Sequence, residues 1–196
     1  MELILGLVIG ICLSAACGFR VFVPLLGMSI AALTGHVHLA SGFEWLGTWP
    51  ALVAFATATV VEIGTYYIPW VDNAMDALMT PVAIAAGVIV TASLLGDMSP
   101  FLRWSLAVIA GGGVSGVVHA GTVAVRATSS GTTGGSTNFL VATAELVGSI
   151  LVTILAILLP FVCLAAVVWI CYRMITTIAR SGLFKRLFAP RHDSMP

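Results

Sequence analysis

Apolar tracts long enough to cross a bilayer are the feature that most constrains how this sequence can fold. They cover residues 3–34, 50–71, 78–96, 101–125 and 139–178. A helix needs about 20 apolar residues to span the hydrocarbon core. Only 8% of the residues are charged, whereas a soluble domain carries about 25%, so a fold in water could not cover its surface. The sequence therefore predicts an all-α integral membrane protein.

Two of these tracts are too long for one straight crossing. The last has Pro160 near its middle, and proline removes a backbone donor and favours a helix break, so we divide it into helices over 139–159 and 161–178. The first contains Gly18, Arg20 and Pro24, which predicts a broken helix. Whether residues 18–34 span the membrane or turn back as a re-entrant segment stays open. About six crossings result.

Basic residues indicate how the chain is oriented. Five of the eight Lys and Arg lie near the C-terminus, namely Arg173, Arg180, Lys185, Arg186 and Arg191. The positive-inside rule places this end in the cytoplasm. Six crossings would put the N-terminus there too and the 35–49 loop outside. We expect one transmembrane domain over 1–178 and a basic cytoplasmic tail over 179–196, which either is solvated or lies along the inner leaflet.

The two halves of the chain resemble each other weakly. ATATVVEIG at 56–64 resembles LVATAELVG at 140–148, which places Glu62 against Glu145. Arg20 and Arg126 each follow a helix rich in small residues. This pattern predicts two inverted three-helix repeats, over about 3–97 and 101–178, as in many secondary transporters. The alternative is two unrelated halves.

Four ionisable residues lie inside apolar tracts: Arg20, Glu62, His119 and Glu145. A charged residue in the bilayer centre costs about 2.5–3.5 kcal/mol on insertion scales, so each is a functional candidate by default. In the functional interpretation the arginines bind substrate and the glutamates couple its movement to protons or ions. In the alternative interpretation, static ion pairs hold the halves together.

Polar residues on the fourth tract form a second candidate group. Ser115, His119 and Thr122 are spaced four and three apart, which places them on one helical face. A lone histidine in a helix is more often a satisfied interior residue than a ligand. Two acidic residues, Asp72 and Asp76, are also four apart. They indicate either a cation or proton-coupling site or a polar turn.

The stretch RATSSGTTGGSTN at 126–138 is rich in Ser, Thr and Gly and leads into a helix. Such backbone at a helix N-terminus can present N–H groups to an anion. We therefore take Arg126, Ser129, Ser130 and Asn138 as candidate residues for a phosphate or carboxylate head group. The alternative is a flexible connecting loop.

Several classes of function have no support. Cys12, Cys17, Cys163 and Cys171 lie in apolar runs without metal-ligand spacing, which predicts buried small side chains, with no metal and no cofactor. Zero net charge gives no reason to expect nucleic acid as a partner. Enzyme motifs are absent, so enzymatic activity is uncertain and disfavoured.

Three segments carry a resemblance to a known family: AACGFRVFVPLL at 15–26, GGGVSGVVHAGTVAVRATSSGTTGG at 111–135, and the glutamate-bearing helices. Together they resemble bacterial membrane proteins grouped as domain of unknown function 4126, over about residues 5–178. The resemblance implies a polytopic protein of the bacterial inner membrane and no settled activity. Phe19, Arg20, Phe22 and Pro24 are faintly similar to DedA-type proteins, which would imply proton-driven transport of a lipid carrier.

The leading hypothesis is a small membrane transporter or lipid flippase-like protein, proton-coupled and acting on an anionic small molecule or lipid head group. One alternative is a non-transporting scaffold or assembly protein with static buried ion pairs. Another is a membrane enzyme that acts on a lipid with His119 as base. Membrane lipids are the expected partners, and a homodimer is one way for so small a chain to enclose a pathway.

Overall fold

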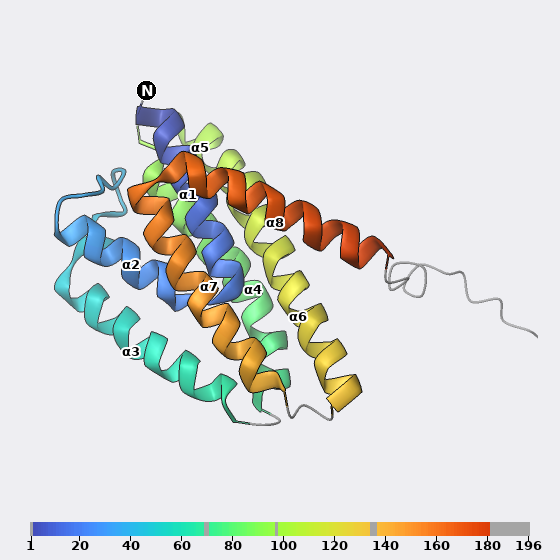
Figure 1. Cartoon of the computed structure of the whole chain (residues 1–196). Coiled ribbons are helices and arrows are strands. Elements are labelled where there is room, and N and C mark those ends of the chain that lie inside the picture. Colours follow the sequence, from blue (N-terminus) through green and yellow to red (C-terminus); the bar gives the residue numbers. More distant parts are fainter. Residues whose placement is uncertain (1, 69–70, 97, 134–136, 181–196) are drawn as a thin grey trace, which may run out of the picture.

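The computed structural model describes residues 2–68, 71–96, 98–133 and 137–180, and the described part contains helices and no strand. Figure 1 shows the arrangement of the helices. In chain order the elements are α1 (Glu2–Phe19), α2 (Phe22–Leu33), the short 3₁₀ turn η1 (Glu44–Gly47), α3 (Trp49–Tyr66), α4 (Val71–Leu94), α5 (Pro100–Leu106), the π-helical turn η2 (Ala107–Gly112), α6 (Gly113–Thr133), α7 (Asn138–Leu158) and α8 (Pro160–Arg180).

The all-α membrane class is confirmed. Among the described residues, four helical stretches are long and apolar enough to cross a membrane: Met75–Leu94, Pro100–Thr132, Asn138–Leu158 and Pro160–Thr177. The second of these runs through α5, η2 and α6 without interruption. Large apolar side chains, including Val60, Ile109 and Phe101, are exposed on the outer faces of the helices. Lipid is the solvent that such a surface requires.

Two helix breaks fall where proline and glycine predict them. Helix α7 ends at Leu158, and α8 begins at Pro160. Helix α1 ends at Phe19, and α2 begins three residues later, at Phe22. The π-helical turn at 107–112 is a feature that the sequence analysis did not predict.

Helices α1 and α2 form a hairpin that begins and ends at the same end of the bundle. Gly6 near the start of α1 packs against the backbone of Leu94 at the end of α4. Beyond α2, the amide of Ala40 donates a hydrogen bond to the carbonyl of Ser93, 2.7 Å away. A helix of 12 residues is only about 18 Å long, so α2 is too short to cross. The segment over 18–34 therefore turns back.

The hairpin also shows where the start of α1 and the 35–49 loop lie relative to each other, which the six-crossing prediction addresses. That inference put the N-terminus and the 35–49 loop on opposite sides of the membrane. In the structure Gly6 of α1 and Ala40 of this loop both lie beside the end of α4, at the end of the bundle that we call the first end. The opposite, second end holds the end of α3 and the start of α7, where the Tyr67 hydroxyl lies 2.8 Å from that of Thr143.

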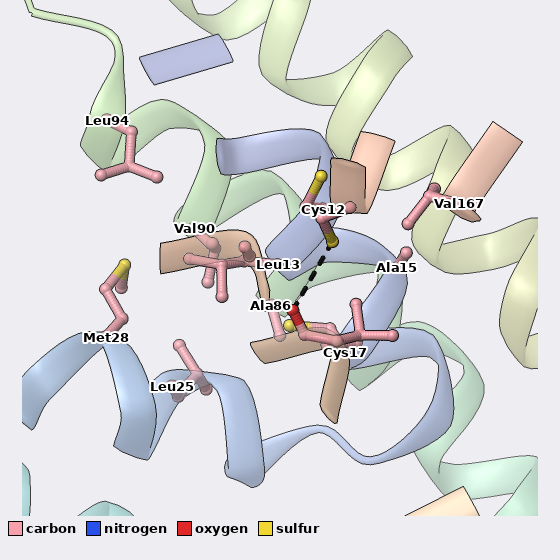
Figure 2. Packing of buried hydrophobic residues seen from close by; sticks show 14 of the residues in the cluster. Cys12, Leu13, Ala15, Cys17, Leu25, Met28, Ala86, Val90, Leu94 and Val167 are labelled. Atoms are coloured by element: carbon pink, nitrogen blue, oxygen red, sulfur yellow. Dashed lines mark hydrogen bonds between the residues drawn. The ribbon is translucent and has the colours of Figure 1, made fainter. Parts of the chain in front are cut away.

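Helix α1 lies in the centre of the bundle and packs against α4, α6, α7 and α8. Its buried residues are mostly small, and Figure 2 shows Cys12, Ala15 and Cys17 among them. The hydroxyl of Ser14 is 2.9 Å from the carbonyl of Gly87 on α4. Small residues allow such close approach of helices where lipid gives no hydrophobic drive for association.

The cysteines behave as the sequence predicts. All four are free thiols; Cys12, Cys17 and Cys163 are buried, and Cys171 is partly buried. Figure 2 shows Cys12 and Cys17 packed within the apolar core.

Candidate functional site

The tip of the α1–α2 hairpin carries a fully buried arginine. Arg20 lies in the break between the two helices, and 1% of its surface is exposed. Its Nη2 donates a hydrogen bond to the carbonyl of Ala142 on α7 at 3.0 Å. The same nitrogen is 3.6 Å from Oε2 of Glu145. The hairpin therefore places a positive charge inside the bundle and against α7.

Glu62 of α3 caps the N-terminus of α2. Its Oε1 accepts a hydrogen bond from the amide of Val21 at 2.8 Å, and its Oε2 accepts one from Phe22 at 3.0 Å. The first amides of a helix have no partner within the helix, and the helix dipole favours negative charge there. Glu62 thus satisfies two amides that would otherwise be orphaned by breaking a helix inside the protein.

Arg126 of α6 forms ion pairs with two carboxylates. Its Nη1 is 2.7 Å from Oδ1 of Asp76 on α4, and its Nη2 contacts Oε2 of Glu145 on α7. Because Oε2 of Glu145 also lies near Arg20, Glu145 bridges the two arginines. The hairpin tip and the helices α4, α6 and α7 are connected through this one network.

Tyr66, the last residue of α3, stacks against both arginines. The guanidinium carbon of Arg20 lies 3.9 Å from the centre of its ring, and that of Arg126 lies 4.1 Å from it. Cation–π contacts contribute about 0.5–2 kcal/mol each, with the larger values at desolvated sites. We call the group of Arg20, Glu62, Tyr66, Asp76, Arg126 and Glu145 the charge cluster.

The charge cluster is buried but not fully paired. None of its charged residues is more than 6% exposed. Two nitrogens of Arg20, Nε and Nη1, have no hydrogen-bond partner among the described residues, and neither do Nε of Arg126 and Oε1 of Glu145. An unmade hydrogen bond of a buried group costs about 1–3 kcal/mol, and more for a charged group. The cluster is therefore rich in donors that a ligand or water could satisfy.

The cluster lies closer to the second end of the bundle than to the first. Glu145 is seven residues from the start of α7 at Asn138, and that helix has 21 residues. At 1.5 Å per residue, the cluster is about 10 Å from that end of a helix about 31 Å long. Its position is thus inside the bundle but away from the middle of α7.

The predicted polar face of the fourth tract is present, and its members contact backbone. Ser115 donates to the carbonyl of Ala83 at 2.7 Å, and Thr122 donates to that of His119 at 2.8 Å. The ring nitrogens of His119 lie 3.2 Å from the carbonyl of Gly18 and 3.4 Å from that of Asp76. All three residues are buried. Ser115 joins α6 to α4, and His119 lies against both the hairpin and α4, next to the charge cluster, whereas the bond of Thr122 stays within α6.

The expectation of a glycine-rich connection over 126–138 is wrong for most of that stretch. Helix α6 continues to Thr133, α7 begins at Asn138, and residues 134–136 lie outside the described part. Threonine hydroxyls within α6 bond back to carbonyls one turn earlier, as Thr128 does to Ala124 at 2.9 Å. Such bonds satisfy the polar side chains inside a helix. Arg126 is consequently a helical residue that faces the bundle.

Three further predicted residues join α6 to α7 and lie outside the charge cluster. The hydroxyl of Ser129 is 2.7 Å from that of Thr137. The amide nitrogen of Asn138 donates to the hydroxyl of Ser130 at 3.0 Å. These contacts hold the second end of the bundle together.

Of the two predicted acidic residues, Asp72 and Asp76, the structure describes the side chain of only Asp76. Asp76 belongs to the charge cluster, whereas the side chain of Asp72 lies outside the described residues, as do Lys185, Arg186 and Arg191 of the predicted tail. Sequence reasoning missed Tyr66. Its only signal was its position one helical turn after Glu62.

The fold and the charge cluster define a class: a helical membrane protein in which a hairpin of two helices carries an arginine into a buried ionic network. Residues 7–180 match the family model described as domain of unknown function (DUF4126). The chain belongs to this family, as its sequence segments indicated. No curated protein and no solved structure matches it.

Proposed function

We propose that this chain is a small membrane transporter or flippase-like protein that moves an anionic small molecule or lipid head group, coupled to protons. The single observation that carries the proposal is Arg20, a buried guanidinium at the tip of the α1–α2 hairpin with two nitrogens that lack a partner among the described residues. Membrane-embedded charge of this kind commonly marks a substrate or ion pathway.

Incomplete pairing favours transport over a static role. Buried polar groups are almost always hydrogen-bonded, and a partly satisfied buried network is less stable than a complete one. An anion beside Arg20 would supply acceptors to its free nitrogens. The broken helix supports the same proposal, because irregular backbone at membrane depth commonly lines the binding sites of transporters.

The proposed topology has five crossings and one re-entrant hairpin. Helices α3, α4, α5–α6, α7 and α8 would cross, and α1–α2 would enter and leave at the first end. With the basic C-terminal end in the cytoplasm, an odd number of crossings puts the N-terminus on the opposite side of the inner membrane. This proposal replaces six crossings and two cytoplasmic termini. The inverted repeat stays a prediction, supported by the meeting of both arginines and both glutamates in one cluster.

A scaffold or assembly protein is the second candidate. The observation that favours it is the pairing of Arg126 with two carboxylates at once, which is what a permanent internal clamp requires. An enzyme with His119 as base has less support, because both ring nitrogens lie within bonding distance of backbone carbonyls. The DedA likeness, with its implied lipid-carrier transport, also stays a prediction.

Reconstitution into proteoliposomes tests the proposal. Two probes are used, radiolabelled inorganic phosphate for uptake and a fluorescent phosphatidylglycerol for flipping, each with and without an imposed proton gradient. We expect the gradient to drive at least one flux and Glu62→Gln and Glu145→Gln to abolish that dependence. Glu44→Gln, at an exposed loop carboxylate, is the matched control. Flux of both probes no faster than in empty liposomes would favour the scaffold.

A further inference from the structure

Glu62 occupies a position that suits an external anion. Its carboxylate accepts hydrogen bonds from the Val21 and Phe22 amides at the start of α2. Helix N-termini bind phosphate and carboxylate groups in many proteins, because free amides and the helix dipole both favour negative charge. Here that position lies inside the protein and is filled by a side chain from another helix.

Arg20 supplies a second, independent reason to place a ligand there. It immediately precedes Val21 in the chain, and its Nε and Nη1 have no partner among the described residues. Three consecutive residues, Arg20 to Phe22, thus carry two amides and two guanidinium nitrogens as donors, and Arg20 is close enough to Glu62 to interact with it electrostatically. Glu62 engages only the amides. A phosphate group has three strong acceptor oxygens and would satisfy more of these donors than a carboxylate does.

The three carboxylates of the charge cluster differ in what holds them. Asp76 and Glu145 form ion pairs with Arg126, and Glu145 also lies near Arg20. Glu62 forms no ion pair with Lys or Arg within the described part of the chain. Protonating Glu62 would therefore break no ion pair, whereas protonating either of the others would.

The groups that face Glu62 come from each neighbouring element. Arg20 at the hairpin tip, Cys17 on α1 and His119 on α6 lie close enough to interact with it electrostatically. Asp76 of α4 and Glu145 of α7, the other carboxylates of the charge cluster, are bound to Arg126. Arg20 is thus the cation available to an anion that replaces the Glu62 carboxylate.

We infer that Glu62 is an internal stand-in for the substrate, and that a phosphate group takes its place at Val21, Phe22 and Arg20 when Glu62 accepts a proton. The inference rests on the proposed function and names its substrate class and its coupling residue. The charges balance for a phosphate group that carries one negative charge: one proton on Glu62 enters with one such anion, so the buried cluster keeps its net charge. Phosphate from a free ion or from a lipid head group has the same chemistry at this site.

Equilibrium binding of radiolabelled inorganic phosphate to the full-length protein tests the exchange. The protein is kept in maltoside micelles, which contain no phosphate, at about pH 5.5 and about pH 8. Linkage of one proton to one anion changes the affinity by up to about tenfold per pH unit. We expect wild type to bind about tenfold or more tightly at the lower pH. We expect Glu62→Gln to bind tightly at both.

Controls separate the site from general effects. Phosphate itself gains and loses protons in the same way in the wild-type and Glu62→Gln experiments. The difference between the pH profiles of binding to the two proteins therefore reports the titration of Glu62. Glu44→Gln should behave as wild type. Arg20→Lys, which keeps the charge and Glu62, should weaken binding about tenfold. Competition by phosphatidic acid in mixed micelles, stronger than by free phosphate, would identify a lipid head group as the source.

The inference is overturned if wild type binds no phosphate at the lower pH, or if Glu62→Gln keeps the pH profile of wild type. If Glu62→Gln does not give monodisperse protein, unchanged binding in Arg20→Lys overturns it instead. Binding does not require transport, so the two proposals fail separately. If phosphate binding shows the predicted pH profile but the liposomes show no flux, transport is rejected and the phosphate site is kept. If a proton gradient drives flux but binding lacks that pH profile, the replacement of Glu62 by phosphate is rejected.

Discussion

Arg20 and Arg126, which come from opposite halves of the chain, stack on the same ring of Tyr66 and share the carboxylate of Glu145. Two like charges this close repel each other, and here the carboxylate of Glu145 and the π-face of Tyr66 offset that repulsion. The stack joins the hairpin tip, α3, α6 and α7. The packing of these four elements is therefore tied to the chemistry of one cluster.

The ring of Tyr66 should matter more than its hydroxyl. Tyr66→Phe keeps both cation–π contacts, whereas Tyr66→Leu removes them. We expect Tyr66→Leu to lower the free energy of unfolding by about 1–2 kcal/mol more than Tyr66→Phe does. Unfolding of the protein in mixed detergent–SDS micelles measures the difference. Equal losses for the two variants would mean that the ring only fills space.

Removing Arg126 should destabilise the protein strongly. Arg126→Met leaves Asp76 and Glu145 buried with one counter-ion fewer, and breaking a buried ion pair in this way costs about 3–5 kcal/mol. The control is Arg173→Met on exposed α8, where Arg173 lies over the Trp169 ring. This variant should lower the free energy of unfolding by less than about 1 kcal/mol. The same micelle titration measures both. A loss for Arg126→Met no larger than that of the control would contradict the ion pairing.

The close contact of α4 with η2 should not tolerate a methyl group. A Cβ at Gly111 would collide with the backbone oxygen of Gly87 and the side chain of Thr91. Overpacking of this kind costs about 1–3 kcal/mol, so Gly111→Ala should melt at a lower temperature than wild type. Gly113→Ala, two residues later with nothing within 4 Å, should be neutral or stabilised by up to about 1 kcal/mol, since alanine favours helix. Similar melting temperatures for the two variants would argue against the contact.

The hairpin topology predicts which positions share one side of the membrane. Single cysteines replace Leu3 near the N-terminus, His38 in the first loop and Thr132 at the end of α6, all of which are exposed. A membrane-impermeant maleimide is applied to intact spheroplasts. We expect Leu3→Cys and His38→Cys to react alike and Thr132→Cys to react only after the membrane is opened. Labelling of Leu3→Cys and His38→Cys from opposite sides would show that α1–α2 crosses.

Local sequence signals were reliable where one short segment decides the outcome. The length of the apolar tracts predicted the membrane class, because a helix must match the thickness of the hydrocarbon core. Pro160 predicted the break between α7 and α8, because its ring and missing N–H act on its own turn. The cost of buried charge singled out Arg20, Glu62 and Glu145 before any contact was known.

The same sequence signals gave wrong or no predictions where the local structure depends on contacts with residues distant in the chain. Residues 126–133 look like a loop by composition, but they form a helix in which threonine hydroxyls bond within the helix and Arg126 pairs across the bundle. The sequence offered almost no indication that Tyr66 belongs to the charge cluster, because its stacking depends on where the tertiary structure places two arginines from other segments.

By itself, the sequence determined that the helices face lipid, where two of them break and which charged residues lie in apolar segments. Each of these follows from hydrophobicity and backbone chemistry within a few residues. Only the tertiary structure decided that α2 turns back, that Glu62 caps it and that Arg20 meets Arg126 over Tyr66. The physical reason is that a broken helix inside a membrane protein needs partners for its free amides. Those partners come from segments remote in the chain, which only packing brings together.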